Sequence, residues 1–246
     1  MRKFFCFLYF FVCLLTSVGC RKAVDRGRTT HVRSEITKEK SKQEHSRSER
    51  QNSESEKRSN LPLSGSEIFK RYGNAVFMVF TSDGTNNYQG SGFFIGRDGL
   101  AVSNYHVFEG TTIGRENIKL AVDNEILYKV KNVVYKSKEQ DVIIFHVDYE
   151  NSIYIPIAKK KPSVGDKVFA IGSPRGLENT FSSGEVSQWR GDYLIQISAL
   201  IDHGSSGGAL INEYGEAIGI TSGSFYDGSQ ANLNYAWSIE AIKGHY

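Results

Sequence analysis

The sequence predicts one all-β domain over residues 63–246, folded as a barrel or a sandwich. Three observations lead to this prediction. Short apolar or alternating segments recur about a dozen times, turn residues interrupt them roughly every eight to twelve residues, and no long segment has a helical period. The 246 residues leave room for one domain of roughly 180–200 residues and additional segments. A hydrophobic content of 39% fits a packed core.

The expected elements follow in chain order. Ser64 or Ser66 can cap a short helix that ends at Arg71. The strands expected in the first half of the domain are residues 74–80, 92–95, 100–104, 118–122, 126–135 and 142–147. Those expected in the second half are residues 167–171, 180–187, 193–197, 209–212, 217–222 and 234–239.

Residues 1–20 have the pattern of a secretory signal. Arg2 and Lys3 precede an apolar run over residues 4–15, which is shorter than the roughly 20 residues that span a bilayer. Residues 17–20, Ser-Val-Gly-Cys, resemble a bacterial lipobox with a relaxed first position. We therefore expect export to the bacterial envelope, in the periplasm or at the outer surface, with a lipid anchor on Cys20. Ordinary cleavage, with Cys20 as a plain thiol, is the alternative.

A polar linker is expected over residues 21–62. Residues 21–60 contain 12 Lys and Arg against 7 Asp and Glu, with no aromatic residue. Such a segment buries too little apolar surface to offset the entropy of ordering, so we expect it to be disordered.

Charge and residue content exclude several classes of function. Residues 61–246 contain 16 Lys and Arg against 20 Asp and Glu, a net charge of −4, which argues against binding to nucleic acid. All three cysteines lie in the first 20 residues, so no disulfide can form inside the domain. The six histidines have no metal-ligand spacing, and no nucleotide-binding motif is present, so no metal or other cofactor is expected. Lys159, Lys160 and Lys161 are expected to form a solvated turn.

The most specific motif is His-Gly-Ser-Ser-Gly-Gly over residues 203–208. A serine hydroxyl attacks a carbonyl only when a base accepts its proton and backbone donors stabilise the oxyanion. Ser206 is the expected nucleophile, and the oxyanion hole is expected along Gly204, Ser205 and Ser206, with the N–H groups of Gly204 and Ser206 as its donors. A glycine-rich hairpin turn is the alternative interpretation.

A histidine and an aspartate complete the expected catalytic set. Residues 101–107 are interpreted as a strand that ends in His106, and histidine is the residue best suited to shuttle protons near neutral pH. Asp141 precedes an apolar strand, so the three residues follow the chain order His, Asp, Ser. Asp123 and Asp148 are rival acids without that setting, and both are interpreted as surface residues.

Five motifs in order then resemble the HtrA/Deg branch of the trypsin-like serine proteases. They lie at residues 90–95, 103–107, 170–177, 215–220 and 235–239, within a match from about Ser66 to Ile242. The resemblance implies two six-stranded antiparallel barrels with the active site in the cleft between them, and no zymogen cleavage. It also implies a primary specificity pocket walled by Leu200 and by Ser222, Gly223 and Ser224. Because Leu200 is apolar, cleavage after small or medium apolar residues is expected.

The sequence departs from the family pattern in three places. Ala209 replaces the usual proline after the two glycines, and Asp202 and His203 replace the usual Asn-Pro. The chain ends at Tyr246 without the PDZ domain of typical members, so regulation through such a domain is not expected. The trimers of the family are built by the protease domain; the resemblance therefore allows a homotrimer, which nothing in the sequence itself supports.

The sequence therefore predicts a serine endopeptidase that cuts unfolded or exported polypeptides in the cell envelope. The rival from another class is a catalytically silent, protease-like binding or holdase protein on the same scaffold. The intact set of His106, Asp141 and Ser206 favours the enzyme, because a silent scaffold has no need of all three.

Overall fold

The computed structural model describes residues 61–123, 125–173, 179–225 and 233–246. The expected signal peptide, Cys20 and nearly all of the expected linker lie outside the described residues. Helix α2 (Gly65–Tyr72) comes first, with Ser64 as its cap in a reciprocal capping box with Glu67. The short helix η1 (Gly73–Ala75) leads from α2 into the first strand. In the described part of the chain, no helix is long and apolar enough to cross a bilayer.

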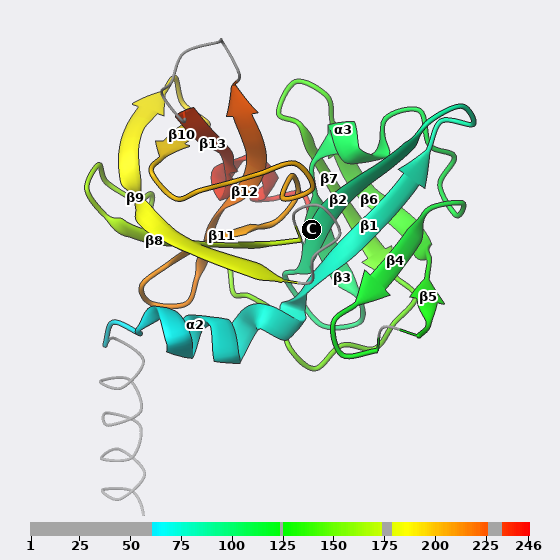
Figure 1. The fold of residues 1–246 in the computed structure, drawn as a ribbon, viewed down its shortest axis with the longest axis horizontal. Helices are drawn as coiled ribbons and strands as arrows, with labels where there is room; N and C mark the ends of the chain where they lie inside the picture. Colours follow the sequence, from blue (N-terminus) through cyan, green and yellow to red (C-terminus); the bar gives the residue numbers. More distant parts are fainter. Residues whose placement is uncertain (1–60, 124, 174–178, 226–232) are drawn as a thin grey trace, which may run out of the picture. The chain divides into compact units, whose positions relative to one another are not determined.

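The first half of the domain is a seven-stranded antiparallel sheet with the order β5-β4-β1-β2-β3-β7-β6 (Figure 1). Only Lys129 separates the two edge strands in the chain, so the sheet curls until its edges approach each other. The strand expected over residues 126–135 is thus two strands with a break at Lys129. The strands are β1 (Val76–Ser82), β2 (Asn87–Phe94), β3 (Leu100–Ser103), β4 (Asn117–Leu120), β5 (Leu127–Tyr128), β6 (Val130–Ser137) and β7 (Val142–Val147).

The second half is a closed six-stranded antiparallel barrel with the order β10-β13-β12-β11-β8-β9. Its strands are β8 (Lys167–Gly172), β9 (Thr180–Arg190), β10 (Leu194–Ile197), β11 (Ala209–Asn212), β12 (Ala217–Phe225) and β13 (Leu233–Ser238). The helix η3 (Ile239–Ile242) follows β13. The prediction of an all-β, two-barrel fold is confirmed, but the first barrel is a curled sheet of seven strands where six were expected, because of the break at Lys129.

Three apolar clusters hold these layers together. One fills the first sheet around Phe77 and Phe145, and another fills the closed barrel around Ile195 and Leu210. A third contains Val76 and Val102 of the first sheet together with Ile171 and Ile220 of the barrel and side chains of α2 and η3. Fully burying such a side chain contributes roughly 1.5–3 kcal/mol. The third cluster therefore fixes the two halves against each other, which the chemistry of a site between them requires.

Candidate active site

His106 follows β3 on the one-turn helix α3 (Tyr105–Phe108). The strand ends at Ser103, so the prediction of a strand that continues to His106 is wrong. The apolar residues that suggested a longer strand, Val107 and Phe108, instead pack from the helix into the core of the first sheet. The side chain of His106 is 43% exposed, so a substrate can reach the imidazole.

Asp141 lies in the turn between β6 and β7 and contacts His106 through both carboxylate oxygens. Its Oδ2 is 2.8 Å from His106 Nδ1, and its Oδ1 accepts a hydrogen bond of 2.9 Å from the backbone N–H of His106. The carboxylate thus orients the imidazole and binds a free N–H group at the start of α3. Asp123 and Asp148 make no contact with His106 among the described residues, and Asp123 Oδ2 accepts a hydrogen bond from Tyr128 instead.

Ser206 lies in the loop between β10 and β11, at the start of a tight turn. Gly207 has a φ of 89°, and a Cβ there would lie 2.0 Å from the carbonyl oxygen of Ser91, so the turn needs glycine. The Ser206 hydroxyl donates a hydrogen bond of 3.3 Å to the carbonyl oxygen of Ser222. In the described part of the chain, no hydrogen bond joins this hydroxyl to His106. Ser222 links Ser206 to Asp141 instead, since its own hydroxyl donates to Asp141 Oδ2 at 3.1 Å.

The backbone around Ser206 leaves two N–H groups available for an oxyanion. The N–H of Ser205 donates to the carbonyl oxygen of Asp202 at 2.9 Å, and that of Gly207 donates to Thr221 at 2.7 Å. Among the described residues, the N–H groups of Gly204 and Ser206 have no protein acceptor. The sequence predicted these two groups as donors, and the N–H of Ser205 is already bonded inside the loop.

A family model described as a trypsin-like peptidase domain matches residues 90–220 of the chain, a segment that contains His106, Asp141 and Ser206. The chain belongs to the trypsin-like serine peptidases. The matched segment runs from β2 of the first sheet to β12 of the closed barrel, so it includes strands of both halves of the peptidase fold.

The peptidase is similar in sequence to HtrA and DegP proteins. It is 34% identical over 163 residues to a "Probable periplasmic serine endoprotease DegP-like" of Rhizobium meliloti, covering 62% of this chain and 31% of that protein. A protein of the same name from Halomonas elongata is 34% identical over 191 residues, covering 71% of this chain and 39% of that protein. The chain spans less than two fifths of the length of these relatives.

Solved structures agree with this membership. The serine endoprotease from Yersinia pestis superposes with a TM-score of 0.65 at 27% identity, covering 74% of this chain and 65% of that chain. The active form of the Rv3671c protease from M. tuberculosis superposes with a TM-score of 0.64 at 18% identity, covering 72% of this chain and 82% of that chain, and shows the same fold.

The structure describes the side chain of Leu200 and the backbone of Ser222 and Gly223 from the expected specificity pocket. Leu200 is 66% exposed, while its neighbours Ala199 and Ile201 point into the core of the closed barrel. The side chains of these three residues alternate in direction as in a strand, which leaves only Leu200 on the outer face. Of the expected opposite wall, Ser222 and Gly223 lie beside Ser206, and the side chain of Ser224 lies outside the described residues.

Two partners of Asp141 were not assigned that role from the sequence. Ser222, expected in the pocket wall, donates its hydroxyl to the carboxylate, and the buried Asn104 donates from Nδ2 to the carbonyl oxygen of Asp141 at 2.9 Å. Asn104 lies in the motif at residues 103–107, two residues before His106. No sequence signal could have found Ser222, because its pairing with Asp141 depends on how the two halves of the domain pack.

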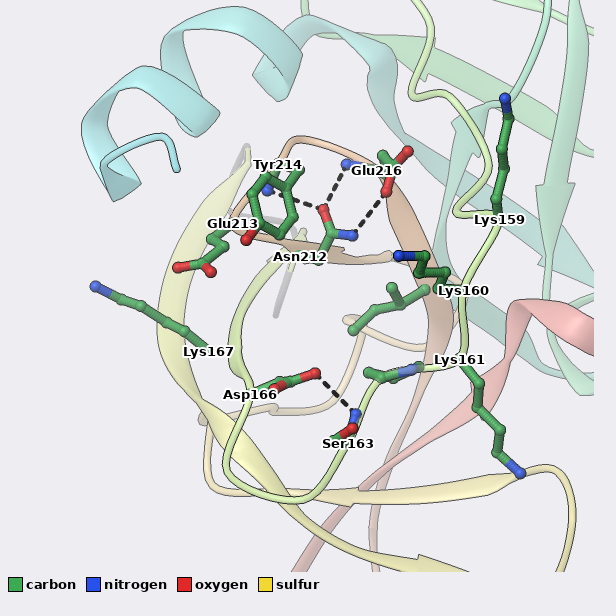
Figure 2. Close-up of a pocket in the computed structure, with 12 residues that line it drawn as sticks. Lys159, Lys160, Lys161, Ser163, Asp166, Lys167, Asn212, Glu213, Tyr214 and Glu216 are labelled. Carbon is green, nitrogen blue, oxygen red and sulfur yellow. Dashed lines mark hydrogen bonds between the residues drawn. The ribbon is translucent and has the colours of Figure 1, made fainter. Parts of the chain in front are cut away.

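A hollow of about 660 Å³ lies at the opposite end of β11 from Ser206 (Figure 2). Its wall includes the three lysines expected in a solvated turn, and all three are exposed, as predicted. Lys160 points into the hollow, whereas Lys161 points away and lies 3.7 Å from the Trp189 ring centroid. The neighbouring Glu213 carboxylate raises the pKa of the Tyr214 hydroxyl. Charges of both signs line the hollow, so its charge selects no single class of ligand.

No cluster of three or more potential metal ligands occurs among the described residues.

Proposed function

We propose that this peptidase is a serine endopeptidase that hydrolyses peptide bonds of polypeptides with His106, Asp141 and Ser206 as its catalytic triad. The two hydrogen bonds from Asp141 to the ring and backbone of His106 carry this proposal. They hold Nδ1 as the protonated nitrogen, which leaves Nε2 free to accept a proton.

The reaction begins when the Ser206 hydroxyl rotates about its Cα–Cβ bond from Ser222 toward His106. Nε2 of His106 then accepts the hydroxyl proton while Oγ bonds to the scissile carbonyl carbon, and the carbonyl electron pair moves to the oxygen. The N–H groups of Gly204 and Ser206 stabilise this oxyanion. When the intermediate collapses, His106 gives the proton to the leaving amine, and an acyl-enzyme remains.

Deacylation repeats these steps with water as the nucleophile. His106 accepts a proton from the water as its oxygen bonds to the acyl carbon, and it returns the proton to Ser206 Oγ as the product acid leaves. Asp141 stays ionised throughout and stabilises the imidazolium that forms twice in each cycle. No cofactor is needed for these steps.

The proposed substrates are unfolded or exported polypeptides of a bacterial envelope, cut after apolar residues. The names of two relatives include the word periplasmic, which supports export, as does the signal-like pattern of residues 1–20. A lipid on Cys20 would hold the peptidase at a membrane surface. The exposed, apolar Leu200 supports the preference for apolar side chains before the cut.

Casein cleavage by the purified full-length chain tests the proposal, with the Ser206→Ala variant as its matched control. We expect cleavage by the wild type and none by the variant, at equal thermal stability. Equal cleavage by both proteins would contradict the assignment of Ser206. Absence of cleavage by both would favour the rival, a protein that binds polypeptides without cutting them.

A further inference from the structure

Ser91 is a fully buried serine of β2, in the first sheet, yet it contacts the loop of the nucleophile. It lies between two glycines that allow a close approach. A Cβ at Gly90 would lie 2.6 Å from Val107 Cγ1 and 3.1 Å from the carbonyl oxygen of Ser206, and one at Gly92 would lie 2.4 Å from the Phe77 ring. The missing side chain at Gly90 therefore lets the backbone of β2 approach the loop, while Gly92 leaves room for the Phe77 ring.

Ser91 is bonded to the loop through both its backbone and its side chain. Its N–H donates to the carbonyl oxygen of Ser206 at 2.7 Å, and its hydroxyl donates to the carbonyl oxygen of Gly204 at 2.7 Å. The same hydroxyl accepts a hydrogen bond of 2.9 Å from the N–H of Ser173, at the end of β8. Its carbonyl oxygen accepts from the Ser103 hydroxyl at 2.7 Å. The hydroxyl thus links β2, the nucleophile loop and β8 at one buried point.

These bonds determine which way the peptide groups of the loop face. In a trans peptide the C=O of one residue and the N–H of the next point in opposite directions, so a carbonyl bonded to the scaffold turns the N–H of the following residue the other way. Ser91 binds the carbonyls of Gly204 and Ser206, and Thr221 Oγ1 binds the carbonyl of Ser205 at 2.6 Å. The Ser205 carbonyl, held by Thr221, turns the N–H of Ser206 the other way. The Ser91 hydroxyl fixes the neighbouring peptide group, between Gly204 and Ser205, and so the position of Gly204.

We infer that Ser91 is a positioning residue, whose hydroxyl holds the oxyanion loop in its reactive conformation from the other half of the domain. This inference rests on the proposed function. It assigns no contact with substrate to Ser91, which acts through the position of Gly204. Preorganised donors stabilise the transition state more than the bound substrate. Removal of the Ser91 hydroxyl should therefore lower kcat and have little effect on KM.

The test compares the full-length wild type with its Ser91→Ala variant on a fluorogenic peptide taken from a casein site that the wild type cuts. Ser91→Ala removes only the hydroxyl and keeps the backbone bond to Ser206. We expect kcat to fall by roughly 10- to 100-fold, somewhat less than the 10²–10³ lost with a whole oxyanion donor, and KM to change by less than about threefold. The affinity for a peptide boronate, whose adduct places an oxygen in the oxyanion hole, should fall in parallel.

Two further variants separate positioning from stability. Ser91→Cys keeps a weak donor and acceptor at the same place, so its kcat should lie between those of the wild type and Ser91→Ala. It also gives the readout if the alanine variant does not fold. Ser238→Ala is the matched control: it removes another buried serine hydroxyl, one that binds the N–H of Glu240 at the start of η3. Its kcat should equal that of the wild type.

The outcomes distinguish this inference from the proposed function. A wild type that is no more active than Ser206→Ala would refute both. Suppose that the wild type is active and that Ser91→Ala is folded. If Ser91→Ala then has the same kcat as the wild type, or differs from it only by a raised KM, the inference alone is refuted. An equal loss of kcat in Ser238→Ala would also refute it, because the effect would then reflect general stability.

Discussion

Replacement of Asp141 by Asn should reverse the tautomer of His106. An asparagine has one oxygen and one NH₂ group where Asp141 has two acceptors. The oxygen is expected at the Oδ1 position, because the backbone N–H of His106 points there and can only donate. The NH₂ group then faces His106 Nδ1 and donates to it. The ring proton moves to Nε2, which can no longer accept the proton of Ser206.

The expected loss is therefore large in rate and small in stability. In the reference Ser-His-Asp enzyme the same change lowers kcat about 10⁴-fold, which corresponds to about 5.4 kcal/mol at about 1.36 kcal/mol for each tenfold change. The unfolding free energy should fall by only about 1–3 kcal/mol, because most hydrogen bonds of the site keep a partner. A domain of ordinary stability, about 5–15 kcal/mol, remains folded after that loss.

The assay is kcat on the fluorogenic peptide, with circular dichroism and thermal unfolding to show that the variant is folded. Asp123→Asn is the matched control, since Asp123 binds Tyr128 and not His106, and its kcat should be unchanged. A folded Asp141→Asn enzyme with turnover within about tenfold of the wild type would refute the reasoning, because another group would then have to orient the imidazole.

Three other predictions address specificity, the turn and the anchor. Leu200→Asp should raise kcat/KM for cleavage after Arg or Lys roughly tenfold or more relative to Leu200→Asn. The reason is that a hydrogen bond between the new carboxylate and the substrate cation contributes about 1.5–3 kcal/mol. Peptide-library profiling of both variants measures this ratio. Gly207→Ala should lower Tm by at least about 2–8 °C and abolish cleavage, because the left-handed backbone alone costs about 1–2 kcal/mol and the new Cβ meets the Ser91 carbonyl. Mass spectrometry of the native protein should find lipid on Cys20 as the first residue; an unmodified start after Cys20 would contradict the anchor.

The sequence predicted the bounds of an element well where a single hydrophobic pattern ran through the whole element. β7 (Val142–Val147) and β11 (Ala209–Asn212) have the expected bounds, because their runs of buried residues end at clear turns. The prediction was least accurate around His106. An apolar run can be buried from a strand or from one helical turn, and periodicity over so few residues does not distinguish the two. The break at Lys129 was missed for a similar reason, since apolar residues continue on both sides of it.

The candidate site could be predicted as a set of residues but not as a network. Residue types and chain order identified His106 and Asp141, which the structure brings into contact. The hydrogen bonds of Ser91, Asn104 and Ser222 join segments that are far apart in the chain, and a serine or asparagine in a strand gives no local sign of such a partner. The exposure of Leu200 depends on strand alternation just before the loop, which the resemblance did not resolve.

The backbone of Asp141 explains why an aspartate in this turn is more than a surface residue. It is one of three non-glycine residues with positive φ in the described part of the chain, at 48°. Glycine adopts this conformation without strain, and aspartate and asparagine adopt it more readily than other residues, so the turn alone does not require an aspartate. The strain, of order 1–3 kcal/mol, is opposed by hydrogen bonds to the carbonyl from Asn104 and to the carboxylate from His106 and Ser222. A strained backbone that several distant residues hold in place indicates selection for the position of the carboxylate, and that position is beside the imidazole of His106.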